Sequence, residues 1–222
     1  IGLLINDLNT TRESSWENRG VDPAHLLSIW GINMVAKKEA KSGKEIKVVN
    51  IVVSAKLGQD IPLEKMAATL SNTEYNPEQF PGLVIRIKAP KTSALIFSSG
   101  NIVCTGARTI QMVNESIKKI IKSLEKINVK IKEFPEIKIQ NIVASGSVGM
   151  DLNLNVLAMK LENTEYEPEQ FPGLVYKLVG SHKATFLLFS NGKVVCTGTK
   201  SEDEVHKVLD ILIENLKKAK AK

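Results

Sequence analysis

Apolar and polar positions alternate in short runs along most of the chain, and these runs are interrupted by stretches with helical spacing. Valine- and isoleucine-rich segments of five to ten residues with period-two alternation predict strands, while apolar residues three and four apart predict amphipathic helices. Read in order, the pattern predicts a strand, a short helix, three strands of which the last two form a hairpin, and a long helix. These elements span Ile46–Ala55, Leu63–Leu70, Leu83–Lys88, Ala94–Ser98, Asn101–Thr105 and Ile110–Ile127.

The same order of elements then recurs, because the chain contains an internal repeat. Residues 46–87 match residues 137–178 at a shift of 137 − 46 = 91, and NTEYNPEQFPGLV returns as NTEYEPEQFPGLV. The later block ALIFSSGNIVCTGA returns as FLLFSNGKVVCTGT at a shift of 186 − 94 = 92, so the second copy has one extra residue near Gly180–His182. Two long copies predict a duplicated α+β domain rather than a solenoid. We expect an antiparallel sheet with the long helices covering one face.

The repeat also sets the expected domain boundaries. We predict a first repeat at 45–132, a second at 133–218, a join at Asn128–Glu136 and a basic tail at 219–222, which we expect to be solvated. Residues 1–44 resemble neither copy, and we expect a mobile extension. Its apolar segment Pro23–Ile32 leaves three alternatives open: a short helix, a cloning remnant or a lineage-specific arm. Met34 is a plausible natural start.

Strand alternation assigns side chains to two faces of the expected sheet. If Ile51, Val53, Ile96 and Cys104 face the helices, the opposite face is largely apolar, and its polar members are asparagine and threonine. That face then carries Asn50, Val52, Leu95, Phe97, Val103 and Thr105, and in the second copy Asn141, Val143, Leu187, Phe189, Val195 and Thr197. Its rim carries Arg86, Lys88, Lys91, Lys177, Lys183 and Lys193.

A large apolar face with a cationic edge calls for a partner that is apolar in the middle and anionic outside. The minor groove of A·T-rich DNA fits, because its floor offers only hydrogen-bond acceptors and phosphates flank it. The formal charge of +6 and pI of about 9.2 permit such a partner without proving it. No apolar stretch is long enough to span a bilayer, and we see no signal peptide.

Other classes of function find little support. The three histidines are scattered, and nucleophile elbows, paired carboxylates and nucleotide-binding loops are missing, so we expect no enzyme, no cofactor and no metal. Cys104 and Cys196 are too few for a disulfide framework, and their parity predicts two buried thiols in a reducing cytosol.

At this point the motifs resemble a known family. NIVVSAKLGQDIPLEKMA, YNPEQFPGLVIRI, TSALIFSSG and VCTGAR resemble the first half of TATA-box-binding proteins. QNIVASG, YEPEQFPGLVYKL and FLLFSNGKVVCTG resemble the second half, and EQFPGL in both halves is typical of archaeal members. The resemblance covers residues 46–218. It implies a ten-stranded antiparallel saddle with four helices on its convex side, in a cytoplasmic, nucleoid-associated general transcription factor.

The resemblance also implies roles for individual residues. It identifies four intercalating phenylalanines, Phe80, Phe97, Phe171 and Phe189. It assigns to the minor groove Asn50, Val52, Leu95, Val103, Thr105, Asn141, Val143, Leu187, Val195 and Thr197. It assigns phosphate contacts to Arg86, Lys91, Lys177 and Lys193. It also implies that transcription factor B, and through it RNA polymerase, is recruited by a surface made of Glu167, Glu169 and Gln170. Asn76 in place of Glu167 distinguishes the first copy from the second.

Two departures from the family pattern bear on these assignments. The spacing of the paired phenylalanines is 97 − 80 = 17 in the first copy and 189 − 171 = 18 in the second. The extra residue is either absorbed in a hairpin loop or shifts the register and turns Phe189 to the other face. In addition, Asn101 stands where the second copy has Lys193, which removes one candidate phosphate contact.

Two alternatives remain beside the DNA-binding hypothesis. A protein-interaction module would use the apolar face to hold a protein ligand or to form a homodimer, but it leaves the paired asparagines and rim cations unexplained. An enzyme using this fold as an accessory half, as in some DNA glycosylases and nucleases, predicts one repeat and a catalytic domain, whereas this chain has two repeats.

Overall fold

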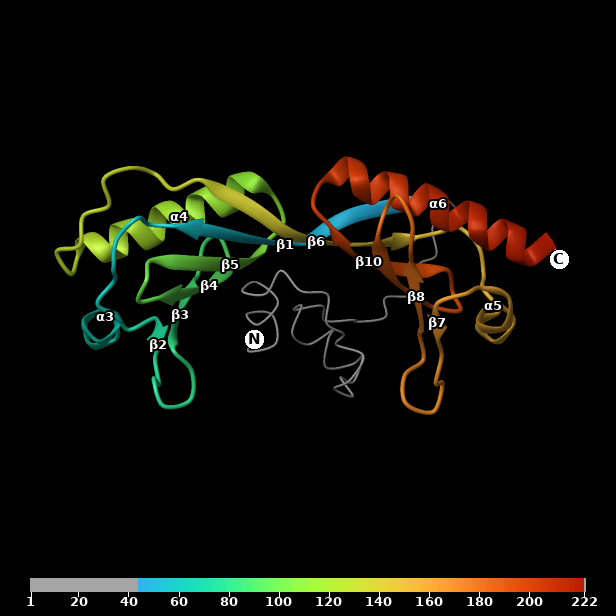
Figure 1. Ribbon diagram of the computed structural model, residues 1–222, viewed down its shortest axis with the longest axis horizontal. Helices are drawn as coiled ribbons and strands as arrows, with labels where there is room; N and C mark the ends of the chain where they lie inside the picture. Colours follow the sequence, from blue (N-terminus) through green and yellow to red (C-terminus); the bar gives the residue numbers. More distant parts are fainter. Residues whose placement is uncertain (1–43, 222) are drawn as a thin grey trace. The chain divides into compact units, whose positions relative to one another are not determined.

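Two runs of five strands and two helices follow each other along residues 44–221, the part of the chain that the computed structural model describes (Figure 1). The first run comprises β1 (Glu45–Lys56), α3 (Leu63–Thr69), β2 (Thr73–Glu74), β3 (Gly82–Ile87), β4 (Thr92–Phe97), β5 (Asn101–Ala107) and α4 (Ile110–Glu125). The second comprises β6 (Ile137–Ser147), α5 (Leu154–Lys160), β7 (Thr164–Glu165), β8 (Leu174–Leu178), β9 (Ala184–Leu188), β10 (Lys193–Thr199) and α6 (Glu202–Ala221). The element order predicted from the pattern is confirmed in both copies, except that the two-residue strands β2 and β7 were not among the predicted elements.

All ten strands belong to one antiparallel sheet with the order β2-β3-β4-β5-β1-β6-β10-β9-β8-β7. The two copies join through β1 and β6 at its centre, where Ile51 pairs with Ile142, its own equivalent in the repeat. The pairing of β1 with β6 shifts register once on each side of this pair, at Val49 and at Gln140. The sheet is therefore continuous across the duplication and approximately two-fold symmetric about its centre.

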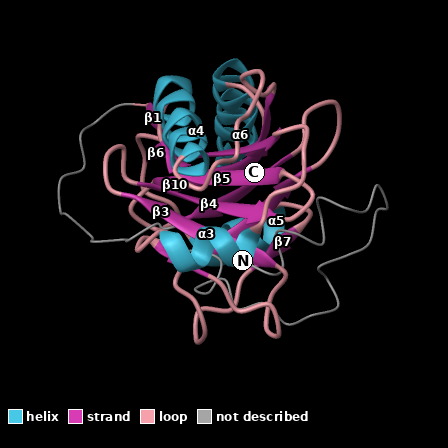
Figure 2. Cartoon of the chain, turned by 90° about the vertical axis from the view of Figure 1, so that its left-hand side faces the viewer, coloured by secondary structure: helices cyan, strands magenta, loops and turns pink. Residues whose placement is uncertain are grey.

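The two long helices lie over the same face of the sheet (Figures 1 and 2). In α4 the apolar side expected from its helical spacing is present: Val113, Ile117, Ile120 and Leu124 are fully buried, and Ile121 is partly buried against the core. The matching side of α6 buries its own apolar residues, Val205, Val208, Leu209, Leu212 and Leu216. Burial of a side chain of this size contributes about 1.5–3 kcal/mol, so each helix is held mainly by this stripe.

The two short helices begin differently, and the last helix is longer than the sequence predicted. The N-cap of α3 is Pro62, which has no side-chain cap hydrogen bond. Asn153, the equivalent of Pro62, does cap α5 by accepting from the backbone N–H of Val156 at 3.2 Å. Helix α6 continues to Ala221, so residues 219–221 of the predicted basic tail belong to the helix. The Lys220 Nζ donates to the backbone carbonyl of Asp151.

The extra residue of the second copy lies in the loop between β8 and β9. Four residues connect β3 to β4, whereas the five residues 179–183 connect β8 to β9. Leu83 pairs with Ile96 and Leu174 pairs with Leu188, which are equivalent positions, so the register is the same in both hairpins. The loop absorbs the insertion, and Phe189 keeps the position that corresponds to Phe97.

The two cysteines are free and fully buried between the sheet and the helices, as the parity of their strands predicts. Burial raises the pKa of the Cys104 thiol to about 11, against a smaller lowering by the Ser116 hydroxyl. Burial raises the pKa of Cys196 to about 12, and the charge of Glu204 adds to the rise.

The predicted N-terminal extension, with Pro23–Ile32, lies outside the described residues except for Lys44. Among residues 44–221, none of the helices combines the length and apolarity that crossing a membrane requires.

Candidate nucleic-acid interface

The face of the sheet opposite the long helices carries the apolar residues that strand parity assigned to it. None of Val52, Val143, Leu187 and Val195 belongs to the hydrophobic core cluster, whereas their strand neighbours Ile51, Val53 and Ile142 do. The four interface phenylalanines lie outside that cluster as well. The two-face division predicted from the alternation is therefore present in the folded chain.

The side chains on this face are less exposed than an open surface implies. In the second copy Val143, Phe171, Leu187, Phe189, Val195 and Thr197 are all buried, at 8% exposure or less. Their equivalents in the first copy are half-buried, apart from Val52 at 4% exposure. Identical side chains thus have different environments in the two halves.

Each copy holds one asparagine on this face in the same hydrogen-bond network. The Asn50 Oδ1 accepts from the backbone N–H of Gly106 at 2.8 Å, and its Nδ2 donates to the Thr105 Oγ1 at 3.1 Å. The Asn141 Oδ1 accepts from Gly198 N–H at 2.9 Å, and its Nδ2 donates to the Thr197 Oγ1 at 2.9 Å. Since a backbone N–H can only donate, it fixes which end of the amide is oxygen.

A bulge in the neighbouring strand makes this contact possible. The pairing of β1 with β5 shifts register next to Gly106, and that of β10 with β6 shifts next to Gly198. The two glycines have φ of +93° and +95°, in the region that other residues rarely adopt. This backbone turn directs the glycine N–H towards the asparagine, and the Nδ2 of each asparagine uses one of its two protons on the threonine. Asn50 is buried at 4% exposure, and Asn141 is half-buried.

The four phenylalanines form two pairs at corresponding places. Phe80 and Phe97 have ring centroids 6.0 Å apart with planes at 66°, and Phe171 and Phe189 have centroids 5.9 Å apart with planes at 69°. Such edge-to-face packing stabilises a ring pair by about 0.5–1.5 kcal/mol beyond the area it buries. Each pair is therefore a rigid apolar unit at one side of its half of the sheet.

A glycine makes room for each phenylalanine pair. A Cβ built on Gly82 would lie 2.6 Å from Cε1 of Phe80, and a Cβ on Gly173 would lie 2.6 Å from Cε1 of Phe171. Real Cβ atoms do not approach this closely, so any larger residue would move the ring. The glycine of the FPGL motif is thus required by the ring next to it.

The loops before Phe80 and Phe171 have the same backbone structure. The N–H of Phe80 donates to the carbonyl of Asn76 at 2.9 Å, and the N–H of Phe171 donates to the carbonyl of Glu167 at 3.0 Å. Glu167, Glu169 and Gln170 are all exposed on the second loop. The loop of the second copy therefore presents two carboxylates, and that of the first presents Glu78 alone.

Arg86 and Lys177, which are predicted phosphate ligands, form ion pairs within the protein. Arg86 on β3 donates from Nε and Nη2 to both carboxylate oxygens of Glu74, at 3.2 and 3.1 Å, and Lys177 on β8 donates to Glu165 at 2.8 Å. The Arg86 guanidinium lowers the pKa of Glu74, first through its hydrogen bonds and then through its charge. Lys91 is exposed in the loop immediately before β4, and Lys193, the first residue of β10, is half-buried.

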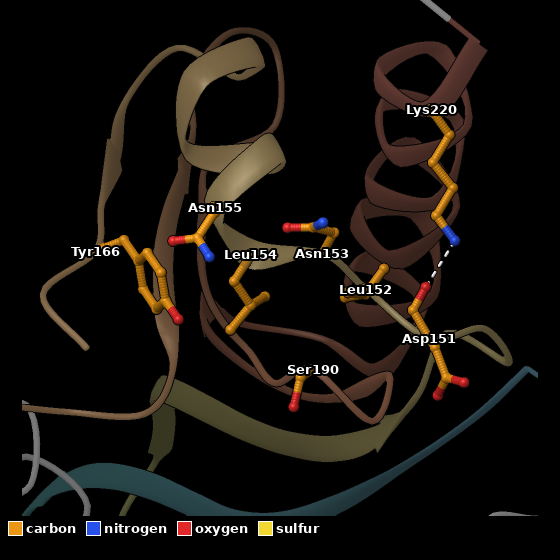
Figure 3. Close-up of a pocket in the computed structure, with 8 residues that line it drawn as sticks. All are labelled: Asp151, Leu152, Asn153, Leu154, Asn155, Tyr166, Ser190 and Lys220. Atoms are coloured by element: carbon orange, nitrogen blue, oxygen red, sulfur yellow. Dashed lines mark hydrogen bonds between the residues drawn. The ribbon is translucent and has the colours of Figure 1, made fainter.

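An open pocket of about 540 Å³ lies away from this face, beside α5 and the end of α6 (Figure 3). It is lined by Asp151, Leu152, Asn153, Leu154, Asn155, Tyr166, Ser190 and Lys220. Most of its polar residues are exposed, and the described residues contain no group of three metal-ligating side chains. The pocket provides neither a metal site nor paired groups for acid–base chemistry.

Three features of the interface were missed by sequence reasoning: the glycine N–H donors to Asn50 and Asn141, the Glu74–Arg86 pair, and the packing of the glycines against the phenylalanines. The sequence Cys-Thr-Gly, which occurs in both copies, is the one available signal for the glycine N–H donors. The ion pair joins residues twelve apart across a two-residue edge strand, which no local pattern reveals.

Comparison with known proteins agrees with this geometry. The family model described as Transcription factor TFIID (or TATA-binding protein, TBP) matches residues 45–127 and 136–219. The chain is 51% identical over 173 residues to the TATA-box-binding protein of Methanocaldococcus jannaschii, covering 78% of this chain and 94% of that protein. It is 54% identical over 177 residues to that of Methanosphaera stadtmanae, covering 78% and 96%.

The same relationship appears among experimental structures. The structure described as Methanococcus jannaschii TBP superposes with a TM-score of 0.74 at 50% identity, over 78% of this chain and 99% of that chain. Both repeats fall within the matched family model, and the ten-stranded sheet is present in the described residues. This chain therefore belongs to the family of TATA-box-binding proteins.

Proposed function

We propose that the protein is a general transcription initiation factor that binds the TATA element of promoters through the minor groove and bends it. The observation that carries this proposal is the asparagine network, which occurs twice on an otherwise apolar face. Each network holds one amide with its oxygen occupied by a glycine N–H, so that its Nδ2 is the group available to a ligand.

The orientation of these amides favours A·T pairs. The floor of the minor groove at an A·T pair carries only acceptors, adenine N3 and thymine O2, to which an Nδ2 proton can donate. A guanine adds a 2-amino donor, which would face the Nδ2 donor and the valine methyl groups beside it. The Nδ2 groups of Asn50 and Asn141 and the valine methyl groups therefore complement A·T pairs and offer no acceptor to a guanine amino group.

The phenylalanine pairs supply the means of bending. Apolar side chains entering between base pairs unstack them at a cost on the order of a few kcal/mol per step, and TATA-binding proteins are the standard example of such wedges. The edge-to-face packing of Phe171 on Phe189 holds the ring that enters and supports it from behind. Because flexible TA steps unstack most easily, deformability adds to the preference for TATA sequences.

The rim supplies cations for the phosphates. Lys91 lies next to the start of β4 and Lys193 is the first residue of β10. Arg86 and Lys177 would exchange their carboxylate partners for phosphate oxygens on binding. Since phosphates flank the groove on both sides, these four residues would fix the position of the protein on the duplex without reading its sequence.

The second loop is the proposed contact for transcription factor B, and through it for RNA polymerase. Glu167 and Glu169 are exposed at one end of the sheet, where negative charge would repel DNA and attract a basic protein. Asn76 lacks the charge of Glu167 at the corresponding position. The partner would thus favour the second half, which makes the assembly directional.

A non-enzymatic interaction module is the second candidate, and it is favoured by the apolar residues of this face that lie outside the hydrophobic core cluster. In that case the face would hold a protein ligand or a second copy of the chain. The two candidates differ in whether binding depends on A·T pairs.

The test is a fluorescence titration of a TATA-containing duplex and a G·C-substituted control. We compare the wild type with the double variant Phe171→Ala/Phe189→Ala, and use Phe134→Ala, which removes an exposed phenylalanine from the linker, as the matched control. The proposal predicts selective binding that the double variant loses and the control keeps. Equal binding to both duplexes, or an unaffected double variant, would favour the interaction module instead.

A further inference from the structure

The two halves of the apolar face are nearly identical in amino-acid sequence. This raises the question of what distinguishes one orientation of a DNA ligand from the other. Asn50, Val52, Ser54, Val103 and Thr105 have the same residue types as their equivalents in the second half. On a surface with such symmetry, a ligand of nearly symmetric sequence could bind in two orientations of similar energy. A difference beside the centre of the face would decide between them.

One such difference lies at the two bulges that flank the centre. Val49 is the extra residue of β1 at its register shift, and Gln140, its equivalent, is the extra residue of β6. Their preceding neighbours Val48 and Ile139 pack against the core, whereas Val49 does not. Both bulge residues are half-buried and directly precede the asparagines of the interface.

Gln140 is held on this face by a serine. Its Nε2 donates to the Ser54 Oγ at 2.6 Å, and Ser54 alternates with the core residues Val53 and Ala55, which places it on the face of Val52. Ser54 pairs with Val103 of β5, so the Gln140–Ser54 pair lies in the half of the face built by the first copy. In the other half, Ser145 pairs with Val195, and the residue equivalent to Gln140 is the apolar Val49.

The two bulges would present different groups to a base pair: a hydrogen-bonding pair at Gln140 and an apolar side chain at Val49. A carboxamide has both an acceptor oxygen and an NH₂ donor, and a serine hydroxyl can serve either of them. The pair can therefore accept from a guanine 2-amino group as well as donate to adenine N3 or thymine O2. Valine can do neither, and a guanine amino group buried against its methyl groups would lose its hydrogen bond to water.

We propose that the Gln140–Ser54 pair is a specificity-determining element, which tolerates a G·C pair beside the centre of the site in the first half only and thereby sets the orientation of the DNA. This inference rests on the proposed minor-groove binding. It adds that the free protein, without any partner, distinguishes the two ends of its site.

The test measures orientation directly. A duplex with a self-complementary A·T core receives one G·C pair on one side of the centre, and a donor fluorophore marks that end. The acceptor is attached through Ser181→Cys in the exposed loop between β8 and β9, because the native thiols are buried. Energy transfer then reports whether the marked end lies at the first or the second half.

The wild type should hold the G·C side at the first half at least about tenfold more often than at the second, a difference of about 1.4 kcal/mol. Gln140→Val should reduce this ratio towards one. The swap Val49→Gln/Gln140→Val should reverse it, because Ser145 is available to the new glutamine as Ser54 is to Gln140. The swap keeps the composition unchanged and so controls for general effects on folding.

Equal populations in the wild type, or a ratio that Gln140→Val and the swap leave unchanged, would overturn the inference while A·T-selective binding persists. If the wild type binds neither the A·T duplex nor its G·C derivative, the proposed function fails, and the inference fails with it. Binding of the wild type to the A·T duplex distinguishes the two failures, because it persists in the first case and is absent in the second.

Discussion

At each asparagine of the apolar face, one glycine N–H decides which end of the amide is presented to a ligand. The distances of 2.8 Å at Asn50 and 2.9 Å at Asn141 are those of ordinary hydrogen bonds between an N–H and an oxygen. In the proposed function the glycine would thus act on recognition without contacting the DNA itself. A substitution that keeps the acceptor and removes the donor separates the two functions of the asparagine.

Asn141→Asp makes that separation. The carboxylate still accepts from Gly198 but cannot donate to adenine or thymine, and its negative charge would face the acceptors on the groove floor. We expect affinity for a TATA duplex to fall at least about tenfold, since an unsatisfied polar group costs about 1–3 kcal/mol. A gel-shift titration measures the loss, circular dichroism checks the fold, and Asn50→Asp is the matched variant. Unchanged affinity in both variants would exclude donation by these amides.

Gly173 is a second residue that acts through its neighbours. Gly173→Ala would place a Cβ 2.6 Å from Cε1 of Phe171 and 3.0 Å from Cε1 of Phe189. We expect the ring pair to shift, with a loss of about 1–3 kcal/mol of folding stability from overpacking and a smaller DNA bend. Denaturant unfolding and end-to-end energy transfer on the duplex measure these effects.

Gly82→Ala provides the comparison in the first half, where the rings are half-buried and have more room to move. It should affect the bend with a smaller loss of stability. A duplex bent equally by the wild type and both variants would show that the glycines do not position the wedges.

Among the elements, the two-residue edge strands β2 and β7 each bring a carboxylate next to a rim cation. Because Arg86 lowers the pKa of Glu74 below its ordinary value of 4.5, their pair contributes at higher pH and is lost as the pH falls through the lowered value. Near neutral pH Glu74 is therefore charged, and in the proposed function it would compete with phosphate for Arg86. This edge strand would then weaken DNA binding.

Glu74→Gln tests that competition. Releasing Arg86 should raise affinity for the TATA duplex several-fold at low salt, and the slope of log affinity against log salt should steepen by roughly one, as expected for one added phosphate contact. Titrations at several salt concentrations measure both, and Glu165→Gln examines Lys177 in the same way. An unchanged slope would mean that Arg86 does not reach a phosphate.

The packing of helices on the sheet makes a separate prediction for the thiols. With pKa values raised to about 11 and about 12 by burial, Cys104 and Cys196 are almost entirely protonated at pH 8. We expect no alkylation by iodoacetamide in the native protein and rapid alkylation in denaturant, as measured by mass spectrometry. Rapid labelling of the native protein would show that α4 and α6 do not cover these strands.

At the scale of the whole molecule, the duplication explains which parts of the structure could be predicted. Alternation within β1 and its copy β6 was sufficient to assign Val52 and Val143 to the face away from the helices, because both strands are long and paired on both sides. The repeat allowed each assignment to be checked against a second copy. Helix α4 was predictable from one apolar stripe.

The features that could not be predicted depend on contacts between distant segments. The site of the extra residue was narrowed to a few positions, but only the pairing of β8 with β9 places it in the loop. The burial of Phe171 and Phe189 at 7% and 8% has no local sequence signal, since Phe80 and Phe97 stand in nearly the same sequence and are half-buried.

The most direct test of minor-groove recognition uses inosine. An inosine·cytosine pair has the minor-groove groups of A·T, because inosine lacks the 2-amino group, while its major groove is that of G·C. Affinity is measured for a TATA duplex, for its inosine·cytosine counterpart and for a G·C duplex of the same length. Minor-groove recognition predicts that the inosine duplex binds within several-fold of TATA and that the G·C duplex does not. Equally poor binding of the inosine and G·C duplexes would contradict it.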